Sequence, residues 1–298
     1  MFTSAQQRSL PVLAALAAII SVQTGAALAK SLFAVIGPEG VAALRLGISA
    51  LLLGTAFRPW RLWRKKAALG PLLAYGLMLG LMNLLIYRAF AFVPVGIAVS
   101  IEVAGPLAVA LLASRQRIDL LWIGLSLGGM LLLSRDAWRG ALDPRGLAFA
   151  LGAALCWGLY IVFGKRVAQG GGQSVASGML IAAGLALPLG LAHADAQLLA
   201  PRVLALGVTV ALLSSAIPFL LDMFAMRHLP APLFGILLSA SPAVSALAGW
   251  LVLGETLSAS QCLGIAAIMS ACAGSAILRQ RSAAALPRIG AAGHASRE

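Results

Sequence analysis

Long apolar runs, separated by short polar or basic segments, fill most of the chain. A helix that crosses a bilayer needs about 20 mainly apolar residues. Ten runs approach or reach that length, near residues 11–35, 39–57, 68–88, 94–113, 119–134, 146–163, 174–192, 203–226, 233–253 and 260–278. The connections are too short for a soluble domain, and the first run is too long and polar for a signal peptide. The pattern predicts an all-α integral membrane protein with ten transmembrane helices.

The chain repeats itself at a nearly constant offset, a little under half of its length. Four residues recur as the same or a similar residue: Pro94 as Pro230, Pro106 as Pro242, Asp119 as Glu255 and Lys30 as Lys165. This repeat offset divides the chain into five-helix repeats at 1–140 and 141–280, followed by an Ala-, Gly- and Arg-rich tail at 281–298 that we expect to be disordered. Because five is odd, the second repeat must enter the membrane inverted. Inverted repeats are common in secondary transporters, with the substrate site between the halves; the alternative is a duplication kept for packing alone.

Composition agrees with a membrane protein. Hydrophobic residues make up 61% of the chain and charged residues 10%, against about 45–50% and 25% in soluble domains. This excludes a soluble enzyme, a disordered protein and a secreted disulfide scaffold.

The net charge of +13 follows from how lysine and arginine are distributed. With the N-terminus inside, 15 of the 22 lysines and arginines lie on the inner face, 5 on the outer face and 2 within the spans. Basic loops stay in the cytoplasm, so we expect both termini there. The basic run at 58–66 is expected to touch anionic lipid rather than nucleic acid.

Several chemistries have no signature in the sequence. The three cysteines lie in apolar stretches and the three histidines are scattered, so we expect neither a metal site nor a disulfide. The nucleotide-binding pattern G-x-x-x-x-G-K-[ST] does not occur, which argues against ATP-driven transport by this chain. No paired catalytic groups stand at a workable spacing. We expect neither an enzyme nor a cofactor.

Glu102 is the clearest candidate for a functional group. It lies eight residues after Pro94, about 12 Å along a helix and close to mid-membrane. Pro106 has no N–H, so the carbonyl of Glu102 loses its helical partner. Ionisable groups at this depth are costly and usually face a cavity. We expect Glu102 to bind a proton or a substrate ammonium; the alternative is a structural ion pair with Arg45.

Other polar residues lie within the predicted spans. Arg45 could hold Glu102 or a substrate carboxylate, because its planar fork fits carboxylates. Gln23 lies deep in the first span, and Asn83 and Tyr87 share a face of the third. These three could bind a small polar solute, or hydrogen-bond between helices.

Weaker candidates are Trp157 and Tyr160, which line a cavity or simply pack. Lys30 lies late in the first span, where its side chain could reach the interface. Asp222 is expected to pair with Arg227 near the inner surface.

Two patterns concern helix geometry. Pro218 frees the carbonyl of Ser214, which predicts a kink in the eighth helix. Two G-x-x-x-G pairs allow close helix approach, a weak signal in a chain with 32 glycines: Gly76 with Gly80 and Gly124 with Gly128.

Four stretches then show a family resemblance. They are SVQTGAALAKSLFAVIGPEGVAALRL (21–46), VPVGIAVSIEVAGPLAVALLASR (93–115), ALGAALCWGLYIV (150–162) and LPAPLFGILLSASPAVSALAGWLVLGETL (229–257). The chain resembles the drug/metabolite transporter superfamily over about residues 11–280. It looks most like its EamA-type threonine/homoserine exporters. The Gly254-Glu255 pair is a mark of the whole superfamily.

The resemblance implies a bacterial inner-membrane carrier that exports threonine and homoserine in exchange for protons. It matches Glu102 to the exporters' glutamate before G-P, and Arg45 to the arginine of their A-L-R run. Family members often carry a glutamate just before the proline of the second repeat, where this chain has Ser241. The second half therefore lacks its own midplane acid unless Asp222 substitutes.

These observations give an alternating-access hypothesis. Glu102 takes up a proton outside and releases it inside, while Arg45 holds the amino-acid carboxylate. Gln23, Asn83 and Tyr87 read the side-chain hydroxyl. The alternatives are export of another metabolite or a cationic drug, and a receptor or scaffold that binds without transport.

Overall fold

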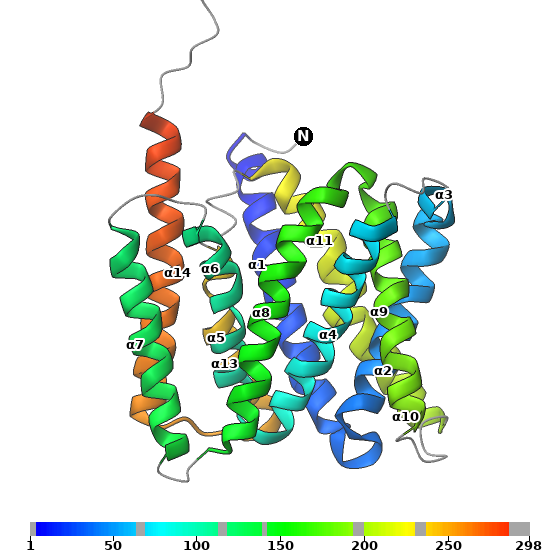
Figure 1. Ribbon diagram of the computed structural model, residues 1–298, viewed down its shortest axis with the longest axis horizontal. Coiled ribbons are helices and arrows are strands. Elements are labelled where there is room, and N and C mark those ends of the chain that lie inside the picture. The colour runs from blue at the N-terminus through cyan, green and yellow to red at the C-terminus, as the bar shows by residue number, and fades with distance from the viewer. Residues whose placement is uncertain are drawn as a thin grey trace, which may run out of the picture.

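The computed structural model describes residues 4–63, 69–112, 118–138, 142–192, 200–229 and 237–285, and within these ranges its regular structure is helical (Figure 1). Five helices are long and apolar enough to cross a membrane: α1 (Ser4–Ser31), α2 (Phe33–Phe57), α4 (Leu69–Phe92), α8 (Pro144–Val167) and α9 (Gly172–Ala192). The other described helices are α3 (Trp60–Trp63), α5 (Val95–Glu102), α6 (Ala104–Leu112), α7 (Asp119–Trp138), α10 (Pro201–Ala211), α11 (Ile217–His228), α13 (Ser241–Leu253) and α14 (Ala259–Ala285). The expectation of an all-helical membrane protein is confirmed.

Several predicted boundaries differ from the structure by four residues or more. The first run was expected to reach residue 35, but α1 ends at Ser31 and α2 begins at Phe33. The chain bends again at Gly37, whose φ of 68° suits glycine, just before Pro38. At the other end, α14 continues to Ala285, so 281–285 is helical rather than part of the tail. The remaining tail, 286–298, lies outside the described residues.

Several of the predicted runs are broken helices. The run 94–113 consists of α5 and α6, which meet at Val103, three residues before Pro106. The run 203–226 consists of α10, a π-helical turn at Leu212–Ala216, and α11. The predicted distortion before Pro218 is thus confirmed. Breaks of this kind expose backbone carbonyls, which is tolerated in a membrane only inside the protein or beside a cavity.

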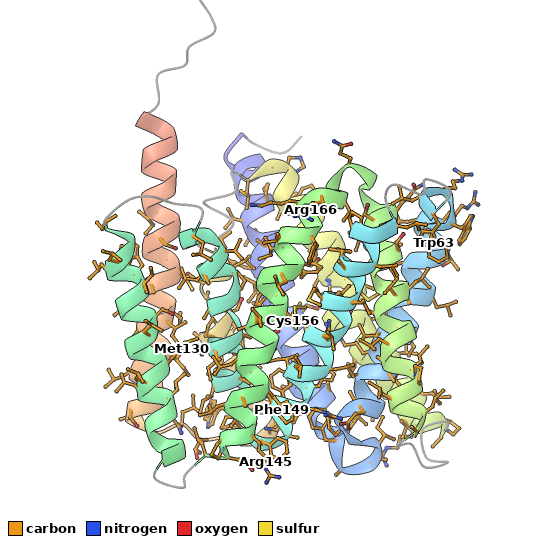
Figure 2. The ribbon with its side chains drawn as sticks, in the orientation of Figure 1. Trp63, Met130, Arg145, Phe149, Cys156 and Arg166 are labelled. Atoms are coloured by element: carbon orange, nitrogen blue, oxygen red, sulfur yellow. The ribbon has the colours of Figure 1, made fainter. Side chains whose placement is uncertain are left out.

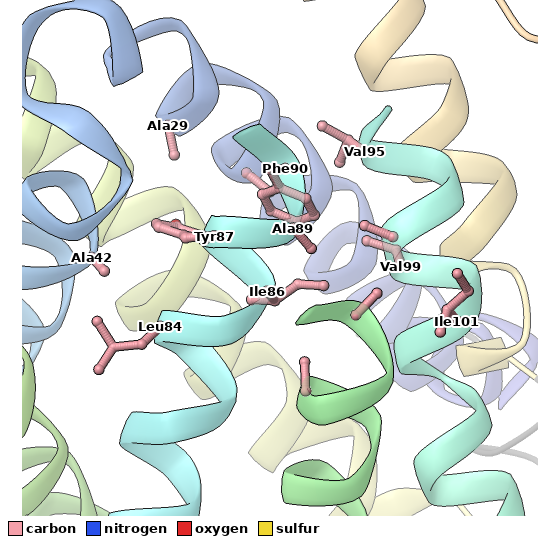
Figure 3. Packing of buried hydrophobic residues seen from close by; sticks show 14 of the residues in the cluster. Ala29, Ala42, Leu84, Ile86, Tyr87, Ala89, Phe90, Val95, Val99 and Ile101 are labelled. Carbon is pink, nitrogen blue, oxygen red and sulfur yellow. The ribbon is translucent and has the colours of Figure 1, made fainter. Parts of the chain in front are cut away.

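The helices pack around a core built on α4 and α5. The closest pairs are α4 with α8, α2 with α9, and α7 with α14; α1 packs against both α11 and α13. Figure 3 shows this core, with Ile86 and Phe90 of α4 and Val99 of α5 among its buried side chains. Large apolar side chains such as Leu112, 87% exposed, lie on the outside. A bilayer would cover them.

The two G-x-x-x-G pairs behave differently. A Cβ atom added at Gly76 would lie 2.5 Å from Cβ of Ile181, and one at Gly80 would lie 3.0 Å from Cα of Ala182. The first pair therefore lets α4 and α9 approach closely, as predicted. A Cβ at Gly124 or Gly128 would meet nothing within 4 Å, so the prediction of close approach was wrong for the second pair.

This contrast gives a stability prediction. Gly76→Ala should lower the melting temperature in detergent, because overpacking costs about 1–3 kcal/mol. Alanine's higher helix propensity returns up to about 1 kcal/mol. Gly124→Ala is the matched control and should leave the melting temperature unchanged or slightly raised. Equal melting temperatures for the two variants would contradict the close α4–α9 contact.

Candidate functional site

Arg45, on α2, is the centre of a polar cluster inside the bundle. Its Nη1 donates to Oδ1 of Asn83 (2.8 Å) and to the hydroxyl of Tyr87 (3.2 Å), both on α4. Its Nε donates to Oγ of Ser215 (3.2 Å) and its Nη2 to the carbonyl of Ser214 (3.0 Å). The guanidinium also lies over the Tyr87 ring, 5.4 Å from its centroid. The cluster therefore joins α2 and α4 to the π-helical turn.

The π-helical turn supplies its carbonyls because it interrupts normal helical pairing. The carbonyl of Ser214 accepts from Arg45, and the carbonyl of Leu213 accepts from Oγ of Ser21 on α1 (2.6 Å). Close approach of α1 depends on Gly25, where a Cβ would lie 2.9 Å from Cβ of Ser214. Sequence reasoning found the freed carbonyl through Pro218 but not its partner, Arg45. π-helical turns are frequent at functional sites.

Glu102 is the last residue of α5, and only 9% of its surface is exposed. Within the described part of the chain, its carboxyl group has no hydrogen bond and no ion pair. Arg45 is near enough to attract it electrostatically, but the direct ion pair with Arg45 that the sequence left open is not formed. The carboxyl group and the guanidinium therefore lie within electrostatic reach of one another, and the guanidinium keeps one N–H of Nη2 that donates to none of its four partners.

The other predicted residues divide between the cluster and the core. Asn83 and Tyr87 are buried and bind Arg45, and Gln23 is buried in α1. Trp157 and Tyr160 of α8 pack against the core. Tyr160 accepts a hydrogen bond from the hydroxyl of Tyr75 (3.0 Å).

Sequence reasoning missed Tyr75, a buried tyrosine on α4 whose ring stacks on Tyr160 with centroids 4.7 Å apart. The pairing crosses from α4 to α8, and no spacing along the chain signals it. It makes Tyr160 a packing partner in this structure.

The secondary candidates lie elsewhere. Lys30 forms an ion pair with Glu255 at 2.6 Å. Ser241 is buried at the first position of α13. Asp222 falls within α11, but its side chain and that of Arg227 lie outside the described residues. Among the described histidine, cysteine and acidic residues, no group of three could hold a metal ion.

An apolar cavity lies apart from the Arg45 cluster. It has a volume of about 550 Å³ and lies between α6, α7 and α8. Its lining is apolar except for Ser126, and includes Leu107, Met130 and Leu155. A cavity with one hydroxyl and no charged group cannot pair with a zwitterion. The Arg45 cluster therefore remains the candidate site.

Comparison with known proteins agrees with this architecture. Residues 144–277 match the EamA-like transporter family. The chain is 46% identical over 274 residues to the threonine/homoserine exporter RhtA of Salmonella typhimurium (strain SL1344), covering 91% of this chain and 93% of that protein. It is 45% identical to the threonine/homoserine exporter RhtA of Escherichia coli (strain K12), covering 90% and 92%. A solved crystal structure with 21% identity has a similar fold, with a TM-score of 0.62 over 92% of this chain and 99% of the other.

Proposed function

Because this chain belongs to the EamA-like transporter family, as a homologue of its threonine/homoserine exporters, we propose that it exports threonine and homoserine across the bacterial inner membrane in exchange for protons. It is a transporter and not an enzyme. The polar cluster supports this proposal because its groups match the two charged ends of an amino acid.

The uncompensated charge of Arg45 is the observation that carries the proposal. Its acceptors are two side-chain hydroxyls, an amide oxygen and a carbonyl, all of them neutral. Among the described side chains no carboxylate pairs with it. Arg45 is half-buried, and a cation held inside a protein without a counter-ion is costly. A substrate carboxylate would relieve that cost.

The remaining groups suit the rest of a threonine or homoserine molecule. Glu102 would attract the substrate ammonium, or a proton in its place. Asn83 and Tyr87, already fixed by Arg45, would hydrogen-bond the side-chain hydroxyl, together with Gln23. A site that hydrogen-bonds a hydroxyl rejects analogues without it, because buried polar groups are then left unpaired.

Competition between a proton and the substrate ammonium at Glu102 gives a route to coupling. Each ligand would exclude the other from Glu102. The binding site would therefore turn from the inside to the outside with the amino acid bound, and turn back with the proton bound. Coupling of this kind needs only that the two ligands exclude each other or favour different states.

Two inverted repeats of five spans would supply the alternating access. In the proposed repeats, the first five spans correspond in order to the last five: α1 to α8, α2 to α9, α4 to α10/α11, α5/α6 to α13, and α7 to α14. When each helix is replaced by its counterpart, the main packing pairs become one another. The pairs α2–α9 and α7–α14 map onto themselves, and α4–α8 maps onto the packing of α1 with α10 and α11.

A reciprocal contact between two glycines also supports the repeats. Gly129 of α7 and Gly264 of α14 correspond to each other at the repeat offset. A Cβ at Gly129 would lie 2.7 Å from the carbonyl oxygen of Gly264, and a Cβ at Gly264 would lie 3.0 Å from the carbonyl oxygen of Gly129. Contacts of residue i with j and of j with i are typical of a twofold axis.

The orientation follows from the basic residues. Arg145 and Arg166 mark the two ends of α8, and the N-terminus lies at the Arg166 end (Figures 1 and 2). Most lysines and arginines belong to the loops at this end, so we place it, with both termini, in the cytoplasm.

Flux of labelled threonine in proteoliposomes tests the proposed function. We expect uptake or release that an imposed pH gradient stimulates about tenfold or more, and that unlabelled homoserine competes. Liposomes without protein, and a gradient collapsed by a protonophore, are the controls.

Other outcomes would assign the chain differently. Flux of a cationic drug without threonine competition would make it a different exporter, and threonine binding without flux would make it a receptor. Threonine flux that ignores the pH gradient would retain the substrate and remove the proton.

A further inference from the structure

A three-part contact closes one end of the bundle around the start of α5. Nζ of Lys30, at the end of α1, donates to Oε1 of Glu255 (2.6 Å) and to the carbonyl of Val93 (3.1 Å). Oε2 of Glu255 accepts from the backbone N–H of Val95 at 2.9 Å. The carboxylate thus caps the positive end of the α5 dipole, where an anion is favourable. We call Lys30, Glu255, Val93 and Val95 the outer latch.

The outer latch joins the two halves. Lys30 and α5 belong to the first repeat, whereas Glu255 follows α13 in the second. At the repeat offset, Lys165 of the second half corresponds to Lys30, and Asp119 of the first half corresponds to Glu255. Lys30 lies in the last turn of α1 and Lys165 in the last turn of α8, and these two helices end at opposite ends of the bundle (Figures 1 and 2). The side chain of Lys165 is exposed.

We infer that Lys30 and Glu255 are positioning residues that hold the bundle closed at the outer end, and that Lys165 and Asp119 form the same latch at the inner end when the outer one opens. The two latches alternate, because the halves are equivalent by exchange. This inference rests on the transporter function proposed above, but it concerns which end is open and not what is carried.

The position of α5 links the latch to the candidate site. The helix begins at Val95, held by Glu255, and ends at Glu102. Its eight residues are all buried and form one helix, so we expect it to shift as a unit when the latch opens. A helix of this length spans about 12 Å. Opening the latch would therefore move the carboxyl group of Glu102 as well.

A second ion pair at the same end provides a matched control. Nε of Arg88 on α4 lies 2.7 Å from Oε1 of Glu39 on α2. Both residues belong to the first repeat, and the positions that correspond to them in the second repeat hold no charged residue. Breaking this pair removes no contact between the two halves of the chain, and no charged pair in the second repeat corresponds to it.

Thiol labelling tests the inference without any need for transport. A reporter cysteine replaces Val95, which is fully buried, in a chain whose Cys156, Cys262 and Cys272 are changed to alanine. A membrane-impermeant maleimide is added to intact cells, which present the outer face, and to inside-out vesicles, which present the inner face. The rate at which the reporter cysteine is labelled is then measured in the preparation where it reacts.

Opposite effects of the two latch variants are the expected result. Glu255→Gln should speed labelling about tenfold, because weakening a charged hydrogen bond shifts a two-state equilibrium by roughly that factor. Asp119→Asn should slow it by a similar factor, since a weaker inner latch favours the outer-closed state. Glu39→Gln should stay within about twofold of the parent.

The decrease with Asp119→Asn is the decisive part, because a damaged fold exposes a buried thiol and never protects it. Unchanged rates in both variants, or a change in the same direction in both, would overturn the inference. The proposed function fails separately, through the absence of threonine flux.

Discussion

Arg45→Lys is expected to lower kcat/KM for threonine transport by about 100-fold or more, although the positive charge is kept. The single ammonium of lysine cannot reproduce the planar set of donors with which the Arg45 guanidinium binds acceptors on α4 and on the π-helical turn. It would leave Asn83, Tyr87 or the Ser214 carbonyl without a charged donor, and each such hydrogen bond is worth about 1.5–3 kcal/mol. Transport assays in proteoliposomes measure the effect.

Arg88→Lys is the matched control for this variant. Arg88 also pairs inside the protein, with Glu39, but it lies outside the Arg45 cluster, so flux should stay within about threefold of the parent. Size-exclusion profiles and melting temperatures show whether each variant is folded. Parental kinetics in a folded Arg45→Lys protein would remove Arg45 from the substrate site.

Glu102→Gln should abolish the response of transport to a pH gradient and leave the protein folded. Glutamine has nearly the same shape but cannot take up or release a proton at neutral pH. Flux driven by the gradient should fall about tenfold or more, to the rate without a gradient. Exchange of labelled for unlabelled threonine, which moves no net proton, should persist with a raised KM, because the amide oxygen of glutamine still accepts a hydrogen bond from the ammonium but carries no charge.

Glu39→Gln controls for the loss of a carboxylate in the same half of the chain, and should keep the full gradient response. Glu102→Gln with the full response would show that the proton binds elsewhere. Loss of exchange even at saturating threonine would show that the substrate cannot be carried without the charge of Glu102, and the separate role in proton coupling would then have no support.

Residue pattern predicted most of the helices and their breaks. Apolar runs mark membrane helices because lipid leaves no alternative for the backbone. Proline marks the breaks because it removes a donor: the α5–α6 junction lies before Pro106, and the π-helical turn lies before Pro218. The run to residue 35 was misjudged because Leu32 and Ile36 are as apolar as the helix before them.

Contacts between distant helices were the part that sequence could not predict. Arg45 and Glu102 were identified by their depth, but nothing in the sequence says that Arg45 would bind a carbonyl 169 residues away. The Tyr75–Tyr160 pair, 85 residues apart, was missed for the same reason. Spacing defines a helix face, whereas partners across the bundle depend on how helices pack.

The two proposed five-helix repeats would differ in the charges that they carry. At the repeat offset, Arg45 corresponds to Leu180 or Ile181, and Glu102 corresponds to Leu237 or Leu238. On this proposal the first repeat supplies the charged groups of the site, whereas the second has hydrocarbon side chains at the corresponding positions. Substitutions in the second repeat would then change the packing around the substrate while Arg45 and Glu102 stay the same.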